Sequence, residues 1–258
     1  MRNFKLEYQN YFKDGYFLEK IIDAYYCMAV KDGDLVIDCG AHLGMHTFPL
    51  SAIVGKSGQV HAIEALPQFA KILTDTTPNN VAVHATAISD FMGETSFHHV
   101  TNCPGLSGIK KRNYYFDVLL EMINVPVTTL DALVPKGNPT FIKLDLEGGE
   151  FAALRGARDI LERAKPMLIF EHGGSLAAEC NGYDLMEFHD YLKSFGYHIY
   201  NIFGKKREGI HFAQSTPWYF VACAQEAHLE IIENAHIALT IATGNYIAQS
   251  AKHFVFHN

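Results

Sequence analysis

The sequence is poor in charge and lacks the patterns that mark fibrous or disordered chains. Of its 258 residues 19% are charged, against about 25% in a typical soluble chain. Glycine follows no triplet period and the apolar residues follow no heptad, which excludes collagen-like and coiled-coil folds. Because 48% of the residues are hydrophobic, the chain is not intrinsically disordered. A chain of this length is expected to bury a large core without metals or disulfides.

Cysteines are few, and no apolar run is long. The five cysteines form no C-x-x-C pair and their number is odd, which argues against a disulfide framework and a zinc site. No H-E-x-x-H or similar spacing occurs among the 14 histidines, so no metal is expected. Without an apolar signal region or a run of about 18 apolar residues, we expect a cytoplasmic protein that does not enter a membrane.

The balance of charge limits the partners of the chain. The formal net charge is −7, which argues against a nucleic-acid binder because such proteins neutralise phosphates with lysine and arginine. Two basic triplets, at 110–112 and 205–207, oppose that sign. We interpret them as solvated loops, although either is able to meet an anionic substrate. The apolar stretch from Ile231 to Ala242 is a candidate for a homodimer contact.

Short apolar runs alternate with helical patterns along the chain, which is typical of β-α-β units and a parallel sheet. The predicted strands are residues 35–37, 59–63, 81–88, 141–144, 167–170, 197–203 and 218–224. Apolar residues at helical spacing predict helices between these strands, on both faces of the sheet. The fold class is therefore α/β, a single doubly wound domain with a seven-stranded, mostly parallel sheet.

Other segments surround or interrupt this domain. The chain divides into a helical N-terminal segment of residues 1–33, a ligand-binding domain of residues 34–224 and a helical tail of residues 225–258. Within the domain, residues 95–100 are predicted to form a short hairpin or added edge, and residues 101–124 an irregular loop over one end of the sheet. Pro49 falls inside a helix predicted from about 45 to 54, where proline should kink the axis.

The end of the first strand reads Asp38-Cys-Gly-Ala-His-Leu-Gly44, which is typical of a nucleotide-binding turn. Gly40 permits a tight turn and a close approach by a ligand, and the next helix start offers free N–H groups. Twenty residues after Gly44 the second strand ends at Glu64, whose carboxylate can accept hydrogen bonds from both ribose hydroxyls. We infer an adenosine-binding half.

Two classes of cofactor share this plan. Nicotinamide dinucleotides use G-x-G-x-x-G, but here the second and third glycine positions hold His42 and Met45. Asp38 at the strand tip would repel a phosphate and suits a cationic cofactor, such as S-adenosylmethionine with its sulfonium and ammonium groups. The spacing favours S-adenosylmethionine over a dinucleotide.

Several segments occur in the order found in FkbM-type methyltransferases. They are residues 35–44, Ala62-Ile-Glu-Ala65, Ala87-Ile-Ser-Asp90, Val127-Thr-Thr-Leu-Asp131 and Phe141-Ile-Lys-Leu-Asp-Leu-Glu-Gly-Gly-Glu-Phe-Ala-Ala-Leu-Arg-Gly-Ala157. The last block looks like the signature of that family. The resemblance covers roughly residues 16–224 and implies a Rossmann-like class I methyltransferase domain, dependent on S-adenosylmethionine, that usually acts on hydroxyl oxygens of polyketides, sugars or glycans.

The resemblance also implies which residues bind the cofactor. They are Asp38, Gly40, Ala41, Gly44, His46, Thr47, Glu64, Ala65, Ile88, Ser89 and Asp145. Around the methionine end of the cofactor we expect Asp38, Gly40, Ala41, Gly44, His46 and Thr47. Glu64 is expected at the ribose, and Ala65, Ile88 and Ser89 around the adenine. Thr47 is interpreted equally well as a helix-capping hydroxyl.

The catalytic candidates are Asp145, Glu147 and His172, which follow the ends of the fourth and fifth strands with Glu171 beside them. The protein has to align the acceptor oxygen with the S–CH₃ bond and to remove its proton. Asp145 is expected to hold the cofactor ammonium or to orient the acceptor. Glu147 and His172 are the candidate bases, since a neutral imidazole works near pH 7. His172 is interpreted equally well as a plain loop histidine.

The sequence therefore predicts an S-adenosylmethionine-dependent O-methyltransferase that acts on a hydroxyl of a small molecule, sugar, glycan or polyketide. A non-catalytic methyltransferase-like binding module is one alternative, and the presence of Asp145, Glu147 and the glycine pattern speaks against it. A nicotinamide-dependent oxidoreductase is the other. His42, Met45 and the lack of a Tyr-x-x-x-Lys pair disfavour it.

Overall fold

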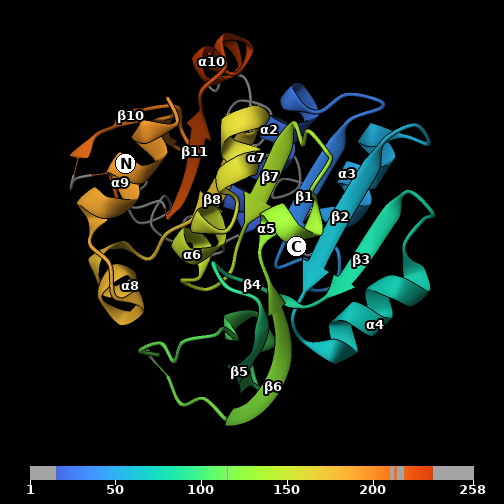
Figure 1. Ribbon diagram of the computed structural model, residues 1–258, viewed down its shortest axis with the longest axis vertical. Helices are drawn as coiled ribbons and strands as arrows, with labels where there is room; N and C mark the ends of the chain where they lie inside the picture. Colours follow the sequence, from blue (N-terminus) through green and yellow to red (C-terminus); the bar gives the residue numbers. More distant parts are fainter. Residues whose placement is uncertain (1–15, 115, 210–211, 214–217, 235–258) are drawn as a thin grey trace, which may run out of the picture.

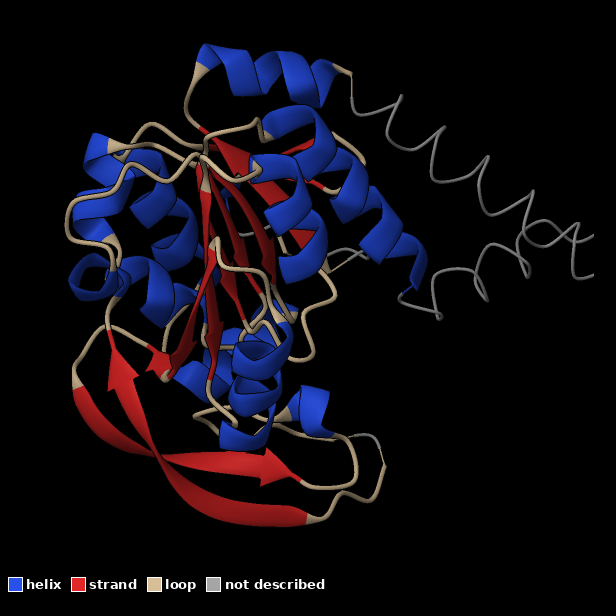
Figure 2. Ribbon diagram, turned by 90° about the vertical axis from the view of Figure 1, so that its right-hand side faces the viewer, coloured by secondary structure: helices blue, strands red, loops and turns tan. Residues whose placement is uncertain are grey.

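The computed structural model describes residues 16–114, 116–209, 212–213 and 218–234. It confirms the predicted α/β fold, with a central sheet between two layers of helices (Figures 1 and 2). The sheet has eight strands in the order β10-β9-β11-β8-β7-β1-β2-β3, one more than predicted. The additional strand, β10 (Lys206–Arg207), pairs with β9 and lies in a segment where we expected only a loop.

The main sheet places a switch in strand order at its centre. Its other strands are β1 (Leu35–Cys39), β2 (Gln59–Glu64), β3 (Val81–Ala85), β7 (Phe141–Leu144), β8 (Met167–Glu171), β9 (His198–Asn201) and β11 (Tyr219–Cys223). Strands β1, β2, β3, β7 and β8 pair in parallel, and β11 lies antiparallel between β8 and β9. The chain winds outward from β1 in one direction to β3 and in the other from β7, so the carboxyl ends of β1 and β7 are where a ligand is expected.

Helices cover both faces of the main sheet. One face carries α2 (Tyr16–Ala29), α3 (Thr47–Val54), α4 (Pro67–Thr76) and α10 (Glu226–Glu233). The other face carries α5 (Leu130–Leu133), α6 (Glu150–Arg155), α7 (Arg158–Arg163), α8 (Gly174–Asn181) and α9 (Leu185–Ser194). Successive side chains of a strand point to opposite faces. Val36 and Val60 therefore pack under α2 and α3, whereas Ile37 and Ile63 pack under the second layer.

Two helices differ from their predicted extent. Helix α3 begins at Thr47, so Pro49 lies in its first turn, where a backbone N–H has no partner within the helix. The single helix that apolar spacing predicts from Phe151 to Leu161 is divided into α6 and α7 around Gly156. The carbonyl oxygen of Ser89 approaches Gly156 so closely that a Cβ atom there would overlap it.

A second, smaller sheet lies below the main one between β3 and β7 in the chain (Figure 1). It consists of β4 (Ala87–Ile88), β6 (Leu120–Thr128) and β5 (Gly93–Val100), in that order. The added edge predicted at 95–100 is part of β5. Figure 2 shows this sheet curving away from the main layers at the end where the ligand is expected.

The predicted irregular loop at 101–124 is wrong in its last part. Residues 120–124 belong to β6, which pairs antiparallel with β5 along the full length of β5. Glu121, Asn124 and Pro126 are poor strand formers and conceal the strand in the sequence. The described part of the remaining connection, residues 101–114 and 116–119, contains one 3₁₀ turn, η1 (Pro104–Leu106), and an isolated β-bridge from Gly108 to His98, and is otherwise irregular.

The ends of the chain are described in part. Residues 1–15 of the predicted N-terminal segment and 235–258 of the predicted tail lie outside the described residues, and so does most of the candidate dimer stretch. Helix α10, at the start of that tail, packs against α2. Among the described residues no helix is both long and apolar enough to cross a membrane.

Candidate active site

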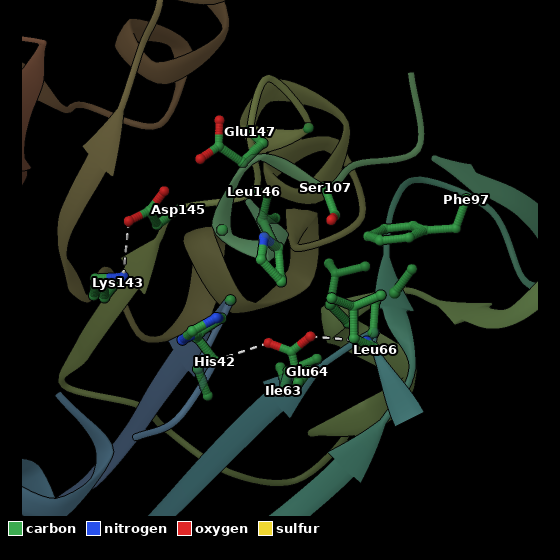
Figure 3. A pocket seen from close by; sticks show the side chains of 18 of the residues that line it. His42, Ile63, Glu64, Leu66, Phe97, Ser107, Lys143, Asp145, Leu146 and Glu147 are labelled. Atoms are coloured by element: carbon green, nitrogen blue, oxygen red, sulfur yellow. Dashed lines mark hydrogen bonds and ion pairs between the residues drawn. The ribbon is translucent and has the colours of Figure 1, made fainter. Parts of the chain in front are cut away.

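A cavity of about 220 Å³ lies at the carboxyl ends of β1, β2 and β7 (Figure 3). Helix α2, the turn after β1, the end of β2, strand β4, strand β5, the 101–119 connection and the end of β7 with the turn after it form its wall. The predicted site residues that line it are Gly40, Ala41, His46, Glu64, Ala65, Ile88, Asp145 and Glu147. Residues from seven separate segments of the chain therefore meet around one space.

Five predicted site residues do not line the cavity, namely Asp38, Gly44, Thr47, Ser89 and His172. Asp38 and Thr47 lie buried behind the wall, where the Thr47 hydroxyl donates a hydrogen bond of 2.6 Å to Asp38 Oδ2. Gly44 lies against the ring of Phe48, and the Ser89 carbonyl packs on the turn between α6 and α7. These residues support the wall and do not reach the space.

Gly40 allows the turns after β1 and β7 to approach each other. Its φ is +78°, and a Cβ atom at this position would overlap the carbonyl oxygen of Asp145. Only glycine satisfies both conditions. His42 follows with a positive φ of 48° and directs its backbone N–H toward the end of β2.

Glu64, at the end of β2, presents a carboxylate to the cavity (Figure 3). Its Oε2 accepts the backbone N–H of His42 and its Oε1 accepts that of Leu66, each at 2.8 Å. Burial raises the pKa of Glu64, although these two hydrogen bonds act in the opposite direction. A carboxylate oxygen accepts two hydrogen bonds. One acceptor position on each oxygen therefore remains, which suits the two hydroxyls of a vicinal diol.

The cavity beyond Glu64 is apolar. Leu66, Ile88 and Phe97 line it, with Ile109 from the 101–119 connection. Leu66 and Phe97 belong to one buried cluster, and Figure 3 shows the Phe97 ring beside Leu66. An apolar slot next to a diol acceptor suits a planar heterocycle on a ribose. Sequence reasoning missed Phe97 because β5 gives no sign of which sheet it joins.

The opposite end of the cavity contains a buried lysine that sequence reasoning also missed. Lys143 is 2% exposed, and its Nζ lies 3.3 Å from Asp145 Oδ2 and 4.0 Å from Asp38 Oδ1. Burial alone would lower the pKa of Lys143, but the charges of Asp145 and Asp38 hold it above its ordinary value. The available signal was a lysine inside an otherwise apolar strand, β7.

Three carboxyl groups, one of them the Asp145 partner of Lys143, lie close together. One oxygen each of Asp145, Glu147 and Glu171 lies within 4.8 Å of the others. Burial would raise the pKa of Asp145, but Lys143 and hydrogen bonds from Glu171 and Tyr219 hold it below its ordinary value. Burial and the charge of Asp145 raise the pKa of Glu171 well above its ordinary value. The opposed shifts favour the proton on Glu171 rather than on Asp145, with Glu171 as the donor of the hydrogen bond between them. Because these groups already have partners, we assign no metal to them.

Glu147 projects from a tight turn that another acid holds in place. Its φ is +55°, and its carboxylate forms an ion pair with Arg112 of the 101–119 connection. The buried Glu150 accepts the N–H groups of Leu146 at 2.7 Å and Gly148 at 3.3 Å. Burial raises the pKa of Glu150 to about 7. The connection thus covers Glu147 and partners its charge.

His172 lies on the side of the sheet away from the cavity. It follows Glu171 directly, and successive side chains of an extended chain point to opposite faces. Its Nδ1 accepts the N–H of Gly174 and its Nε2 contacts the Tyr183 hydroxyl, both at 3.0 Å. Its ring packs edge-on against Phe188, and burial lowers the pKa of His172 to about 4. We therefore do not retain the expectation that His172 removes the acceptor proton.

Helix α2 closes the polar end of the cavity with a side chain that was not predicted. Glu19 lines the cavity, its Oε2 lies 2.7 Å from His46 Nε2, and its Oε1 accepts the Tyr219 hydroxyl at 3.1 Å. The other ring nitrogen of His46 lies 3.5 Å from Asp23. Burial would lower the pKa of His46, but Asp23 and Glu19 raise it overall.

Fold and site together define a class of protein. The strand order around β1, the antiparallel β11 between β8 and β9, and an acid at the end of β2 beside an apolar slot form a Rossmann-like class I methyltransferase domain. The sequence matches the family model of the methyltransferase FkbM domain over residues 38–199, and the chain belongs to this family. The predicted family is confirmed, and with it S-adenosylmethionine as the cofactor.

Several solved structures are similar to this chain. An FkbM methyltransferase from Methylobacillus flagellatus KT is 22% identical with a TM-score of 0.45, over 73% of this chain and 43% of that one. An S-adenosylmethionine-dependent O-methyltransferase from Thermotoga maritima is 15% identical with a TM-score of 0.42, over 80% and 64% of the two chains. Fibrillarin from Aeropyrum pernix, with bound S-adenosyl-L-methionine, is 13% identical with a TM-score of 0.43, over 78% and 76%.

The present chain thus spans less than half the length of the Methylobacillus protein. No curated protein matches the sequence.

Proposed function

We propose that this chain is an S-adenosylmethionine-dependent O-methyltransferase whose acceptor is a hydroxyl of a small molecule, sugar, glycan or polyketide. The observation that supports this proposal is that the two ends of one cavity differ in polarity. A diol acceptor and an apolar slot form one end, and a cluster of carboxyl groups forms the other. When bound, the cofactor supplies a methyl group on a sulfonium, which is an excellent leaving group.

The residues present fit this cofactor. Glu64 would accept the two ribose hydroxyls, and Leu66, Ile88 and Phe97 would enclose the adenine. Gly40 lines the cavity, and its lack of a side chain lets the backbone of Asp145 approach the turn after β1. The methionine end would lie toward Asp145 and Lys143, where acidic groups suit a cationic centre.

We assign the role of general base to Glu147. Both Glu147 and Asp145 line the cavity, and each has a cationic partner, Arg112 and Lys143 respectively. Asp145 in addition accepts the Tyr219 hydroxyl, and its pKa is lowered. A carboxylate of lowered pKa is a poor proton acceptor. In the proposed step the acceptor oxygen forms a bond to the methyl carbon, its O–H bond breaks, and the proton passes to a carboxylate oxygen of Glu147.

Arg112 and the 101–119 connection position Glu147, although the positive charge of Arg112 also makes this carboxylate a weaker proton acceptor. The ion pair with Arg112 holds the Glu147 carboxylate in one orientation at the cavity wall. Ser107 and Ile109 of the same connection line the cavity, so this segment also excludes water from it. We place the reaction in the cytoplasm, which is consistent with the five cysteines being free thiols.

The test is methyl transfer to a panel of hydroxylated sugars and polyketides, with S-adenosylhomocysteine and the methylated product measured by mass spectrometry. We expect a methyl ether, stable to mild base. Glu147→Gln should lower turnover by about 10²- to 10⁴-fold. Exposed Glu162 on α7 provides the matched control, because Glu162→Gln should leave turnover unchanged. A methyl group on nitrogen or carbon, or a fully active Glu147→Gln variant, would contradict the proposal.

Binding provides a test that needs no acceptor. We expect S-adenosylhomocysteine, and not NADH, to bind to the purified chain in isothermal titration calorimetry. Binding of NADH alone would favour an oxidoreductase.

A further inference from the structure

We infer that Glu19 of helix α2 binds the ammonium group of S-adenosylmethionine, which makes α2 part of the cofactor site. The inference rests on the proposed function, because it assumes that the cavity holds this cofactor. Glu19 lies outside the strand ends from which the other cofactor residues come, and outside the part of the chain that matches the family model.

The position of Glu19 is the first observation. Its side chain is 20% exposed and lines the cavity together with Lys143 and Asp145. His46 and Tyr219 hold its two oxygens at 2.7 and 3.1 Å, so the carboxylate is fixed at the polar end of the cavity. A carboxylate held in this way needs no reorganisation to receive a ligand.

The second observation is that the Tyr219 hydroxyl lies between two carboxylates and cannot donate a hydrogen bond to both. Its hydroxyl lies 3.0 Å from Asp145 Oδ2 and 3.1 Å from Glu19 Oε1, but it has one proton to donate. One of the two carboxylates is therefore left without a donor on the side that faces the other. An ammonium group carries three N–H donors and supplies the missing one.

Asp145 is the competing partner for the ammonium, and its surroundings disfavour it. Lys143 lies 3.3 Å from its Oδ2, and Glu171 and Tyr219 donate hydrogen bonds to it. Among the described residues, Glu19 receives hydrogen bonds from His46 and a share of Tyr219, and Lys143 interacts with it through charge without a hydrogen bond. The acid with fewer donors has more capacity for a further one.

The charges around this end of the cavity favour a cation. The carboxylates on the surrounding elements are Glu19, Asp23, Asp38 and Asp145, and the cationic groups are Lys143, His46 and Lys20, which pairs with Asp23. Glu171 is adjacent and hydrogen-bonds to Asp145, and burial and the charge of Asp145 raise its pKa well above its ordinary value. The carboxylates outnumber the cations even with His46 protonated, so a cationic ligand neutralises an existing excess of negative charge.

The experiment compares two nucleosides in isothermal titration calorimetry with the full chain. S-adenosylhomocysteine carries the ammonium, and 5′-methylthioadenosine retains the adenosine and the thioether but lacks the amino-acid part. Glu19→Gln keeps the size of the side chain and removes its charge. We expect it to weaken S-adenosylhomocysteine binding about tenfold or more, the usual loss for one charge-assisted hydrogen bond, and to leave 5′-methylthioadenosine within twofold of the wild type.

Asp23→Asn provides the control on the same helix, because Asp23 contacts His46 but does not line the cavity. It should leave the ratio of the two affinities unchanged. Decarboxylated S-adenosylmethionine, which keeps the ammonium and lacks the carboxylate, should show the full loss with Glu19→Gln.

The outcomes are distinct. Equal weakening of both nucleosides by Glu19→Gln would mean that Glu19 only positions α2, and unchanged binding of both would mean that it does not contact the ligand. Either result overturns the inference while the proposed function stands. A wild-type chain that binds neither nucleoside overturns the proposed function itself.

Discussion

Truncation of Glu64 should remove most of the affinity for the nucleoside. Glu64→Ala deletes both carboxylate oxygens at the end of β2, and each of them already accepts one backbone N–H at 2.8 Å. The acceptor position that remains on each oxygen is the one assigned to a ribose hydroxyl. Two hydrogen bonds to a charged group are therefore lost with the ligand.

The expected loss of affinity follows from these two hydrogen bonds. A hydrogen bond to a charged group contributes about 1.5 kcal/mol or more, so the loss is about 3 kcal/mol, which corresponds to about 150-fold in Kd. The N–H groups of His42 and Leu66 also lose their acceptors, so the variant should be less stable. Affinity has to be measured well below its unfolding temperature.

The assay is isothermal titration calorimetry with S-adenosylhomocysteine, after circular dichroism has shown that the variant is folded. Exposed Glu94 in β5 provides the control, and Glu94→Ala should bind like the wild type. A folded Glu64→Ala variant that binds within threefold of the wild type would refute the assignment of the diol site.

Two further predictions concern groups behind the cavity. The folded-state pKa of Glu150, about 7, lies above its ordinary value of 4.5, so the folded state binds this proton more tightly than the unfolded state. The free energy of unfolding should therefore fall by about 3 kcal/mol as the pH rises from about 4.5 to about 7. In urea unfolding at pH 5 and pH 8, Glu150→Gln should not show this fall in the free energy of unfolding. An identical pH dependence in the variant and the wild type would argue against the raised pKa of Glu150. His172→Ala should lower the free energy of unfolding by about 2 to 3 kcal/mol, because it leaves a hole beside Phe188, and should leave S-adenosylhomocysteine affinity within twofold. A variant of unchanged stability with lost turnover would restore His172 as a candidate base.

The sequence was informative where function depends on the order of elements along the chain. Gly40, Glu64 and Asp145 each follow a buried strand, and parallel strands bring such positions to one edge of the sheet. Their meeting around one cavity follows from strand order alone. The fold class follows from the same alternation of strands and helices.

The sequence was uninformative where function depends on pairing between distant segments. The role of Lys143 depends on Asp38, which is its direct neighbour on β1. A single sequence does not show strand register, so this contact could not be predicted. Glu19 reaches the cavity because α2 packs on the same face of the main sheet as α3. In contrast, the side of His172 could have been inferred from the alternation that places Glu171 toward Asp145.

The chain segment that forms the smaller sheet begins and ends at neighbouring positions. Ala87 pairs with Val127 and Ile88 with Thr128, so the two ends of the excursion lie side by side in parallel. The excursion nevertheless supplies Phe97 and Ile109 to the cavity. Exchange of the segment between these paired ends for that of a relative would rebuild one wall of the site. The strands that carry Gly40 and Glu64 would keep their order, so the proposed ribose site would persist while the wall with Phe97 and the Arg112 partner of Glu147 change together.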